Sequence, residues 1–335
     1  MSPAHAAVAA ITAVERALPD KVVTNLDLER VVDSSDAWIR ERTGIRERRI
    51  LEEAGISTLA TQVAEGLLRR TGTAAEEVDL IIVATMTPDM LLPSTACLVQ
   101  AAVGATRAWA FDLQAACSGF VYALVSGAQF IATGAHRKVM VIGADKMSAV
   151  VDPTDRATCV LFGDGAGGVL LEPAQAEGEG IVDFELHADG RGGKDLFIRA
   201  GGSLHPATRE TVEARDHYLH QEGRAVFRFA IQRMAEVSLS LLERNGLTPK
   251  DLKLFVPHQA NQRIITATAE RMGLEEERVL SNIERYANTT AGTVPIALSE
   301  AAEEGRLEPG DLVQMTAVGA GLTWGSVLMR WGRVP

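Results

Sequence analysis

The stretch YALVSGAQFIATGAHRKVMVIGA, residues 122–144, decides how this chain folds. Small and apolar residues first recur at helical spacing, a glycine and a charged turn follow, and the run VMVI is typical of a buried strand. The stretch PIALSEAAEEGRLEPGDLVQMTAVGA, residues 295–320, has the same order of helix, glycine, turn and strand. Aligning Ala123 with Ala297 gives an offset of 174 residues (297 minus 123). The pattern predicts that one half of the chain repeats the build of the other.

The same offset lays the apolar run VDLIIVA, residues 78–84, over LKLFVPH, residues 252–258. Because two separate places agree, we predict an α/β protein made of two duplicated halves. The boundary is expected in the polar, glycine-containing segment 172–180, which gives halves of residues 1–175 and 176–335.

Composition limits the class of protein. The chain has 335 residues and 47% hydrophobic content, but no apolar run long enough for a transmembrane helix. Its net charge of −11 argues against general nucleic-acid binding. Three cysteines fit neither a disulfide framework nor a zinc pattern, so we expect a reducing, cytoplasmic location. The short apolar run 6–14 is expected to be a first strand, not a signal peptide.

One cysteine stands where a strand-like run becomes a helix. In DLQAACSGF, residues 112–120, Cys117 would lie near the helix N-terminus, where free N–H groups and the helix dipole lower a thiol pKa. The alternative is packing, since buried cysteines are common. Cys97 and Cys159 lie in apolar runs and are interpreted as packing residues.

Two further polar residues take equivalent places. His258 follows the strand-like run 252–257, and Asn288 lies in a turn equivalent to that of Cys117. Such strand ends gather catalytic groups in α/β sheets, although a core histidine and a helix N-cap remain alternatives. His217 and His220 lack a third ligand, so no metal or other cofactor is expected. The glycines of FGDGAGGVLLEP, residues 162–173, are expected to allow close backbone packing because no helix follows them.

Together the motifs make the chain similar to a known family. It resembles the β-ketoacyl-acyl carrier protein synthase III enzymes, which initiate bacterial fatty-acid synthesis. The resemblance covers nearly the whole chain and is carried by these motifs: SSDAWIRERTGIRERR, AACSGF, DPTDRATCVLFGDGAGG, VFRFAI, VPHQANQRI, YANTTAGTVPIAL and GAGLTWGS. It implies the thiolase-like fold, with two duplicated α/β halves in five α-β-α-β-α layers, and usually a homodimer.

The resemblance also implies a catalytic triad of Cys117, His258 and Asn288. Cys117 would take an acyl group from acyl-CoA as a thioester in a ping-pong reaction. Malonyl-acyl carrier protein would then lose CO2, and its enolate, held by His258 and Asn288, would attack the acyl group. The backbone N–H groups of Cys117 and Ala320 would form an oxyanion hole.

Substrate contacts are implied in the same way. Coenzyme A would be bound by Trp38, Arg42, Arg156, Gly223, Phe227 and Asn261, and the acidic carrier protein by Arg228, Arg263 and Arg271. Leu92, in PDMLLPST, would reach the partner subunit's acyl pocket and help to set the primer range. Neither nucleic acid nor a membrane is expected as a partner.

Three alternatives stay open at this point. A synthase III-like enzyme of secondary metabolism differs in its acyl donor, which the motifs do not identify. A thiol hydrolase would need only the cysteine and the histidine. A non-catalytic partner subunit is disfavoured because Cys117, His258 and Asn288 are all present.

Overall fold

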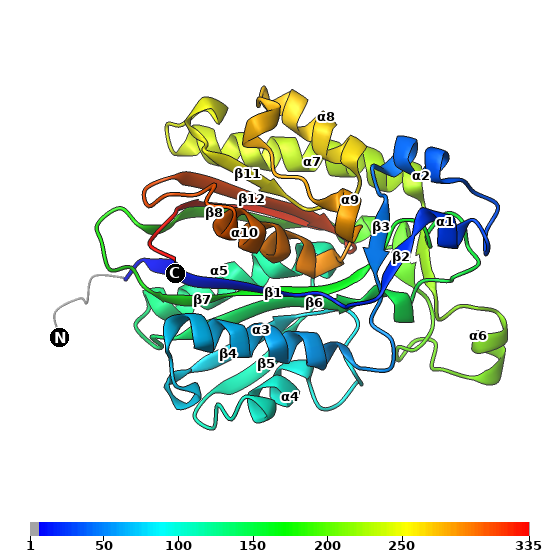
Figure 1. Cartoon of the computed structure of the whole chain (residues 1–335), viewed down its shortest axis with the longest axis horizontal. Coiled ribbons are helices and arrows are strands. Elements are labelled where there is room, and N and C mark those ends of the chain that lie inside the picture. Colours follow the sequence, from blue (N-terminus) through cyan, green and yellow to red (C-terminus); the bar gives the residue numbers. More distant parts are fainter. Residues whose placement is uncertain (1–6, 335) are drawn as a thin grey trace.

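Two β-sheets form the centre of the molecule, and helices pack between them and on both outer faces (Figure 1). The computed structural model describes residues 7–334. The first sheet has the strand order β1(Ala9–Ala17), β7(Asp164–Pro173), β6(Val139–Lys146), β4(Leu80–Ala84), β5(Trp109–Leu113). The second has the order β11(Leu254–Pro257), β12(Leu312–Gly319), β13(Thr323–Arg330), β8(Gly180–Ala188).

The two sheets repeat one another. In the first, β4 and β6 are parallel, and β6–β7 and β7–β1 are antiparallel. In the second, β11 and β12 are parallel, and β12–β13 and β13–β8 are antiparallel. β4 and β11 begin at Leu80 and Leu254, which are 174 residues apart, as the alignment of the two halves requires. The predicted duplicated α/β fold is confirmed.

The helices complete the layers. α5(Gly119–Ala132) and α10(Thr293–Glu303) lie between the sheets (Figure 1). The outer layers are α3(Ile56–Thr71) and α4(Thr95–Ala102) on one side and α7(Gly223–Arg244) and α8(Gln262–Met272) on the other. Helix α5 is apolar around its circumference because both sheets cover it. The expected five layers are present.

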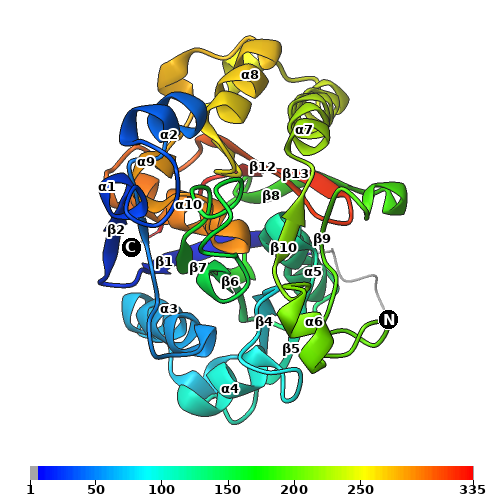
Figure 2. The ribbon, with the colours of Figure 1, turned by 90° about the vertical axis from the view of Figure 1, so that its right-hand side faces the viewer.

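Shorter elements gather at the end of the molecule that faces the viewer in Figure 2. They are the helices α1(Asn25–Leu28), α2(Asp36–Thr43), α6(Arg209–Glu213) and α9(Ile283–Tyr286), and the ribbons β2(Val22–Thr24) with β3(Glu47–Arg49) and β9(Leu196–Ile198) with β10(Leu219–Gln221). These elements surround the ends of β4, β6, β11 and β12, so they cover the edge where the candidate site residues were expected.

Glycine permits the close contact between the halves. A side-chain carbon on Gly143 would lie 2.2 Å from the carbonyl oxygen of Ala291, and one on Gly167 would lie 2.7 Å from the backbone nitrogen of Ile296. Both distances are far below van der Waals contact, so only glycine fits at either position. The expectation that the glycines of 162–173 serve close packing is confirmed at Gly167.

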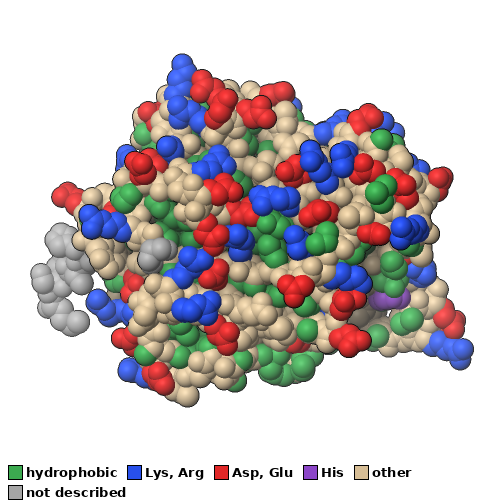
Figure 3. Space-filling model, viewed as in Figure 1, with side chains coloured by type: hydrophobic (Ala, Val, Ile, Leu, Met, Phe, Trp, Pro, Cys, Tyr) green, Lys and Arg blue, Asp and Glu red, His purple; other side chains and the backbone are tan. Residues whose placement is uncertain are grey.

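The strands pass from the first sheet to the second between Pro173 and Gly180. The division of the chain into domains of residues 1–175 and 176–335 stays a prediction. The expected first strand is β1, which begins at Ala9; Ala6, in the predicted run, lies outside the described residues. No helix among residues 7–334 has the length and apolar character needed to cross a bilayer. On the face shown in Figure 3, basic and acidic side chains are interspersed.

Candidate active site

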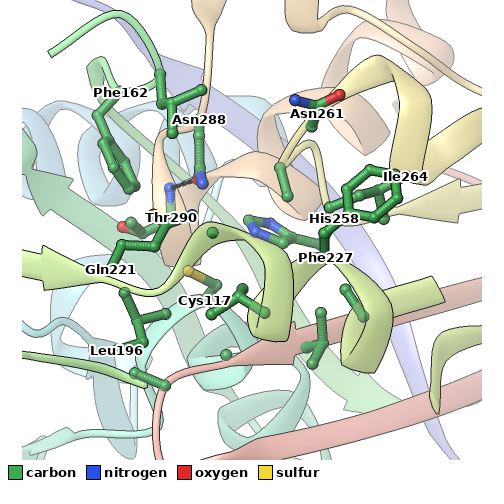
Figure 4. A pocket seen from close by; sticks show the side chains of 18 of the residues that line it. Cys117, Phe162, Leu196, Gln221, Phe227, His258, Asn261, Ile264, Asn288 and Thr290 are labelled. Atoms are coloured by element: carbon green, nitrogen blue, oxygen red, sulfur yellow. Dashed lines mark hydrogen bonds between the residues drawn. The ribbon is translucent and has the colours of Figure 1, made fainter. Parts of the chain in front are cut away.

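One cavity of about 360 Å³ lies where the two sheets and the short elements meet. This size is within the range of small-molecule sites. Figure 4 shows Cys117, His258 and Asn288 around it, together with apolar side chains such as Leu196 and Phe227. Its walls therefore bring together one residue of the first half and two of the second, as the offset of 174 residues predicted.

Cys117 lies in a short turn, Ala116–Ser118, between β5 and α5. Ala116 has a φ of +47°, and its counterpart 174 residues later, Thr290, has a φ of +50°. Left-handed backbone is unusual for residues with a side chain, so both turns are held by their surroundings. A side-chain carbon on Gly319 would lie 2.8 Å from the backbone nitrogen of Cys117, so the end of β12 rests directly on the cysteine turn.

The protonation state of Cys117 differs from the sequence prediction. The side chain is 8% exposed. Burial raises the pKa of the Cys117 thiol to about 12, and the charge of Asp145 acts in the same direction. The prediction that this pKa lies below its usual value is therefore wrong, because burial raises it.

His258 directly follows β11 and is 1% exposed. Burial lowers its pKa to about 3, so the imidazole is neutral at physiological pH. Its Nδ1 lies 2.7 Å from the hydroxyl oxygen of Thr293, which leaves Nε2 for the cavity. Gln259 fixes the loop after the strand, since its amide nitrogen donates to the carbonyl oxygens of Pro257 and Leu280.

The side chain of Asn288 is oriented by the turn that follows it. The backbone N–H of Thr290 donates to Oδ1 of Asn288 at 2.8 Å, drawn as a dashed line in Figure 4. Because Oδ1 is used in this way, the amide presents Nδ2–H groups as its free donors. Asn288 is 6% exposed and lines the cavity. The N-cap of the short helix Thr290–Gly292 is Thr289, so Asn288 lies one residue before the cap position.

Three residues that support the site were not singled out from the sequence. Thr293 contacts His258, Thr290 contacts Asn288, and the buried carboxyl of Asp145 accepts hydrogen bonds from Thr290 and from the loop after β4. The spacing TTAGT could have suggested that Thr290 and Thr293 lie one helical turn apart. The position of Asp145 at the end of the apolar run VMVIGA was the only signal for it.

The backbone of Ala320 follows β12 and also lines the cavity. The contact between Gly319 and the nitrogen of Cys117 brings the two implied oxyanion-hole residues to the same wall. Their role stays a prediction.

Five of the six residues implied in coenzyme A binding line this cavity; they are Trp38, Arg42, Gly223, Phe227 and Asn261. The sixth, Arg156, places its guanidinium 4.3 Å from the ring centre of Trp38. A base sandwiched between the two would need about 7 Å, or two contacts of about 3.5 Å. Arg156 must therefore move away from Trp38 before an adenine can enter between them.

The amide of Asn261 already has two partners. It caps α8 by accepting from the N–H of Arg263, and it donates to the carbonyl of Arg42 at 3.1 Å. A contact with pantetheine would add to this structural role.

The three arginines implied in carrier-protein docking are exposed on α7 and α8. They are Arg228, Arg263 and Arg271. The guanidinium of Arg263 lies 5.4 Å from the ring centre of Phe227, a residue of the cavity wall. At least this arginine thus stands beside the cavity.

Leu92 does not line the cavity of its own chain. It is 85% exposed, and its neighbours Leu91 and Met90 are 83% and 48% exposed. Its predicted place in a partner's pocket stays a prediction.

One other interpretation needs correction. Cys97, expected to be a packing residue, is exposed on α4, because the helix turns this side chain outward. Cys159 is buried in an apolar cluster, as expected. His217 packs against Tyr218, and His220 against Phe197.

Comparisons with known proteins match this arrangement. A family model described as "3-Oxoacyl-[acyl-carrier-protein (ACP)] synthase III" matches residues 111–190, and its C-terminal counterpart matches residues 242–331. A β-ketoacyl-[acyl-carrier-protein] synthase III of Chlorobium phaeovibrioides is 59% identical over 96% of this chain and 99% of its own length. The enzyme of that name from Solibacter usitatus is 55% identical over 93% and 96%.

Solved structures agree with these matches. The 3-oxoacyl-[acyl-carrier-protein] synthase III of Aquifex aeolicus superposes with a TM-score of 0.89 at 46% identity, covering 96% of this chain and 100% of the other. The priming β-ketosynthase of the R1128 polyketide pathway superposes with a TM-score of 0.92 at 32% identity, covering 100% and 99%.

Proposed function

The chain belongs to the β-ketoacyl-acyl carrier protein synthase III family of condensing enzymes of fatty-acid synthesis, and from this we propose that it joins an acyl group from acyl-CoA to malonyl-acyl carrier protein through an acyl thioester on Cys117. The observation that carries the proposal is the meeting of Cys117, His258 and Asn288 in one apolar-walled cavity. The chemistry divides into two half-reactions that share the sulfur of Cys117.

In the first half-reaction, the sulfur of Cys117 attacks the thioester carbonyl of acyl-CoA. The thiol proton passes to the departing thiolate of coenzyme A, so acylation neither consumes nor releases a proton. The backbone N–H groups of Cys117 and Ala320 donate to the carbonyl oxygen as it becomes negative, and each such donor contributes about 3 kcal/mol to transition-state stabilisation. The N-terminus of α5 favours the developing thiolate, while burial opposes it.

In the second half-reaction, the malonyl group loses CO2 and leaves an enolate. The enolate carbon attacks the acyl carbonyl, the bond to Cys117 breaks, and the thiolate takes up one proton. Asn288 suits this step because its free Nδ2–H groups can donate to the enolate oxygen. A donor aimed at a charge that exists only in the transition state raises kcat.

Thr293 allows the neutral imidazole of His258 to adopt either tautomer. The Thr293 hydroxyl lies 2.7 Å from Nδ1 of His258 and 3.0 Å from the carbonyl oxygen of Thr290. A hydroxyl that donates to Thr290 accepts from Nδ1–H, which leaves Nε2 as an acceptor. A hydroxyl that donates to Nδ1 instead leaves Nε2–H as a donor for the enolate oxygen. The two arrangements are the two tautomers of the neutral ring. To pass from one to the other, one ring nitrogen must lose a proton and the other gain one by exchange with solvent or substrate, while the hydroxyl turns to suit.

The partners follow from the same proposal. Acyl-CoA would enter past Trp38 and displace Arg156, and an acidic carrier protein would dock on the exposed arginines of α7 and α8. A homodimer, in which Leu92 enters the partner's pocket, belongs to the proposal as well. The proposal requires no cofactor, because the thiol, the imidazole, the amide and two backbone N–H groups supply the groups that the two steps use.

A scan of acyl-CoA primers with malonyl-carrier protein tests the proposal, with CO2 release and product mass measured together. We expect one CO2 for each carrier-bound product, whose mass equals that of malonyl-carrier protein minus CO2, with the acyl group added in place of one hydrogen. Free fatty acid without CO2 would instead indicate a thiol hydrolase. The primers accepted would also separate fatty-acid initiation from the priming of another pathway.

A further inference from the structure

Asp145 is a buried carboxyl that the two half-reactions do not use. It is the penultimate residue of β6 and is 0% exposed. A buried carboxyl without hydrogen-bond partners would destabilise the fold. The groups that hydrogen-bond to Asp145 therefore show which segments it holds in place.

Its two oxygens face different halves of the chain. Oδ1 accepts from the loop after β4, namely from the hydroxyls of Thr85 and Thr87 at 3.0 and 2.9 Å and from the backbone N–H groups of Met86 and Thr87 at 2.8 and 3.2 Å. Oδ2 accepts from the turn after Asn288, namely from the hydroxyl of Thr290 and the N–H of Ala291. One carboxyl thus fixes both loops.

The turn held by Oδ2 needs such support. Thr290 is β-branched and has a φ of +50°, a left-handed conformation that L-residues rarely adopt. The backbone N–H of this residue donates to Oδ1 of Asn288 and so orients the amide. A change in the Thr290 backbone would therefore turn the Nδ2–H donors of Asn288.

We propose that Asp145 is a positioning residue for decarboxylation and condensation, acting through Thr290 on the amide of Asn288. This inference rests on the role given to Asn288 in the proposed function. It predicts a selective defect, because acylation of Cys117 does not need the Asn288 amide.

Two matched substitutions separate positioning from general support of the network. Thr290→Val and Thr85→Val each remove one hydroxyl donor from the same carboxylate at nearly constant shape, but only Thr290 contacts Asn288. Thr290→Ser keeps the hydroxyl and serves as the conservative variant. Asp145→Asn replaces one of the two acceptor oxygens by an NH2 group, which cannot accept from the N–H of Ala291 on one side or from that of Met86 on the other.

The experiment measures two rates for each variant of the full-length protein, namely acylation of Cys117 by acyl-CoA and release of labelled CO2 from malonyl-carrier protein. We expect Thr290→Val to slow CO2 release by about 10- to 100-fold, the effect of a small misplacement of a catalytic group, with acylation nearly unchanged. Folded Asp145→Asn should show the same selectivity, and Thr290→Ser should restore most of the rate. If Asp145→Asn does not fold, the Thr290 variants carry the test.

Wild-type CO2 release by Thr290→Val would overturn the inference, as would an equal loss of both rates. An equally selective loss in Thr85→Val would also overturn it, because the effect would then belong to the whole network. Asn288→Ala is the reference. If Asn288→Ala released CO2 at the wild-type rate, the proposed function of Asn288 would fail. If Asn288→Ala were defective and Thr290→Val were not, only the role of Asp145 would be refuted.

Discussion

The hydroxyl of Thr293 lies 2.7 Å from Nδ1 of His258, on the side of the imidazole away from the cavity. Both residues are buried, so the hydroxyl is the hydrogen-bond partner of Nδ1 in whichever tautomer the ring adopts. Thr293→Val should lower kcat for condensation by about 10-fold or more with little change in KM, because Nδ1 loses the hydroxyl that pairs with it and orients the ring. It should also destabilise the protein by about 1–3 kcal/mol by leaving Nδ1 unpaired.

Steady-state kinetics and urea unfolding check both effects. Thr293→Ser, which keeps the hydroxyl, is the control and should retain most of the wild-type kcat. A wild-type kcat in Thr293→Val would show that the hydroxyl does not govern His258.

His258 and Asn288 are expected to serve condensation more than acyl transfer. His258→Ala and Asn288→Ala should each slow malonyl decarboxylation by about 100-fold or more, the usual effect of losing a donor to a developing oxyanion. Some acylation of Cys117 should survive in both variants. Labelled CO2 release and peptide mass, measured on the same preparations, provide the comparison. Near-normal decarboxylation by either variant would remove that residue from the mechanism.

The alkylation rate of Cys117 should depend steeply on pH. Because burial raises the pKa of this thiol to about 12, the reactive thiolate is a small fraction at neutral pH. The rate of iodoacetamide labelling at Cys117 should therefore rise about tenfold per pH unit between about pH 7 and pH 9. The experiment uses Cys97→Ala protein, since Cys97 is exposed and would react as well. A rate that levels off below pH 8 would show that the helix N-terminus prevails over burial.

Leu92 is predicted to influence the primer range from across a dimer interface. Leu92→Phe should reduce kcat/KM for butyryl-CoA or isobutyryl-CoA more than for acetyl-CoA, by about 1–3 kcal/mol of discrimination, because a larger side chain shortens an apolar pocket. Leu91→Phe is a matched control, since Leu91 is similarly exposed, at 83% against 85%. Equal losses for all primers in Leu92→Phe, or the same selectivity in Leu91→Phe, would exclude Leu92 from the pocket.

The local sequence was sufficient for several strands and helices of the two sheets' layers and for the places of three site residues. Continuous apolar runs predicted β4 and β11, and residues at helical spacing followed by a glycine predicted α5 and α10, because periodicity and capping are local properties. The 174-residue offset then placed Cys117, His258 and Asn288 together, since equivalent strand ends must meet when two similar halves stack.

Properties that depend on packing could not be predicted in this way. The contact between Asp145 and Thr290 joins residues 145 positions apart, and no local pattern indicates it. The high pKa of Cys117 results from the depth of its burial, which depends on the approach of Gly319 from another sheet. The stacking of Arg156 on Trp38 depends on the path of two loops. The exposure of Cys97 depends on which face of α4 packs against the sheet.

The central claim is that Cys117 carries the acyl group, and peptide mass mapping after incubation with acyl-CoA tests it most directly. The protein has three free cysteines, so each can be followed as a separate peptide. We predict that the acyl mass appears on the peptide containing Cys117 and that subsequent addition of malonyl-carrier protein removes it. An acyl group on Cys97 or Cys159, or a label on Cys117 that malonyl-carrier protein does not remove, would contradict the account.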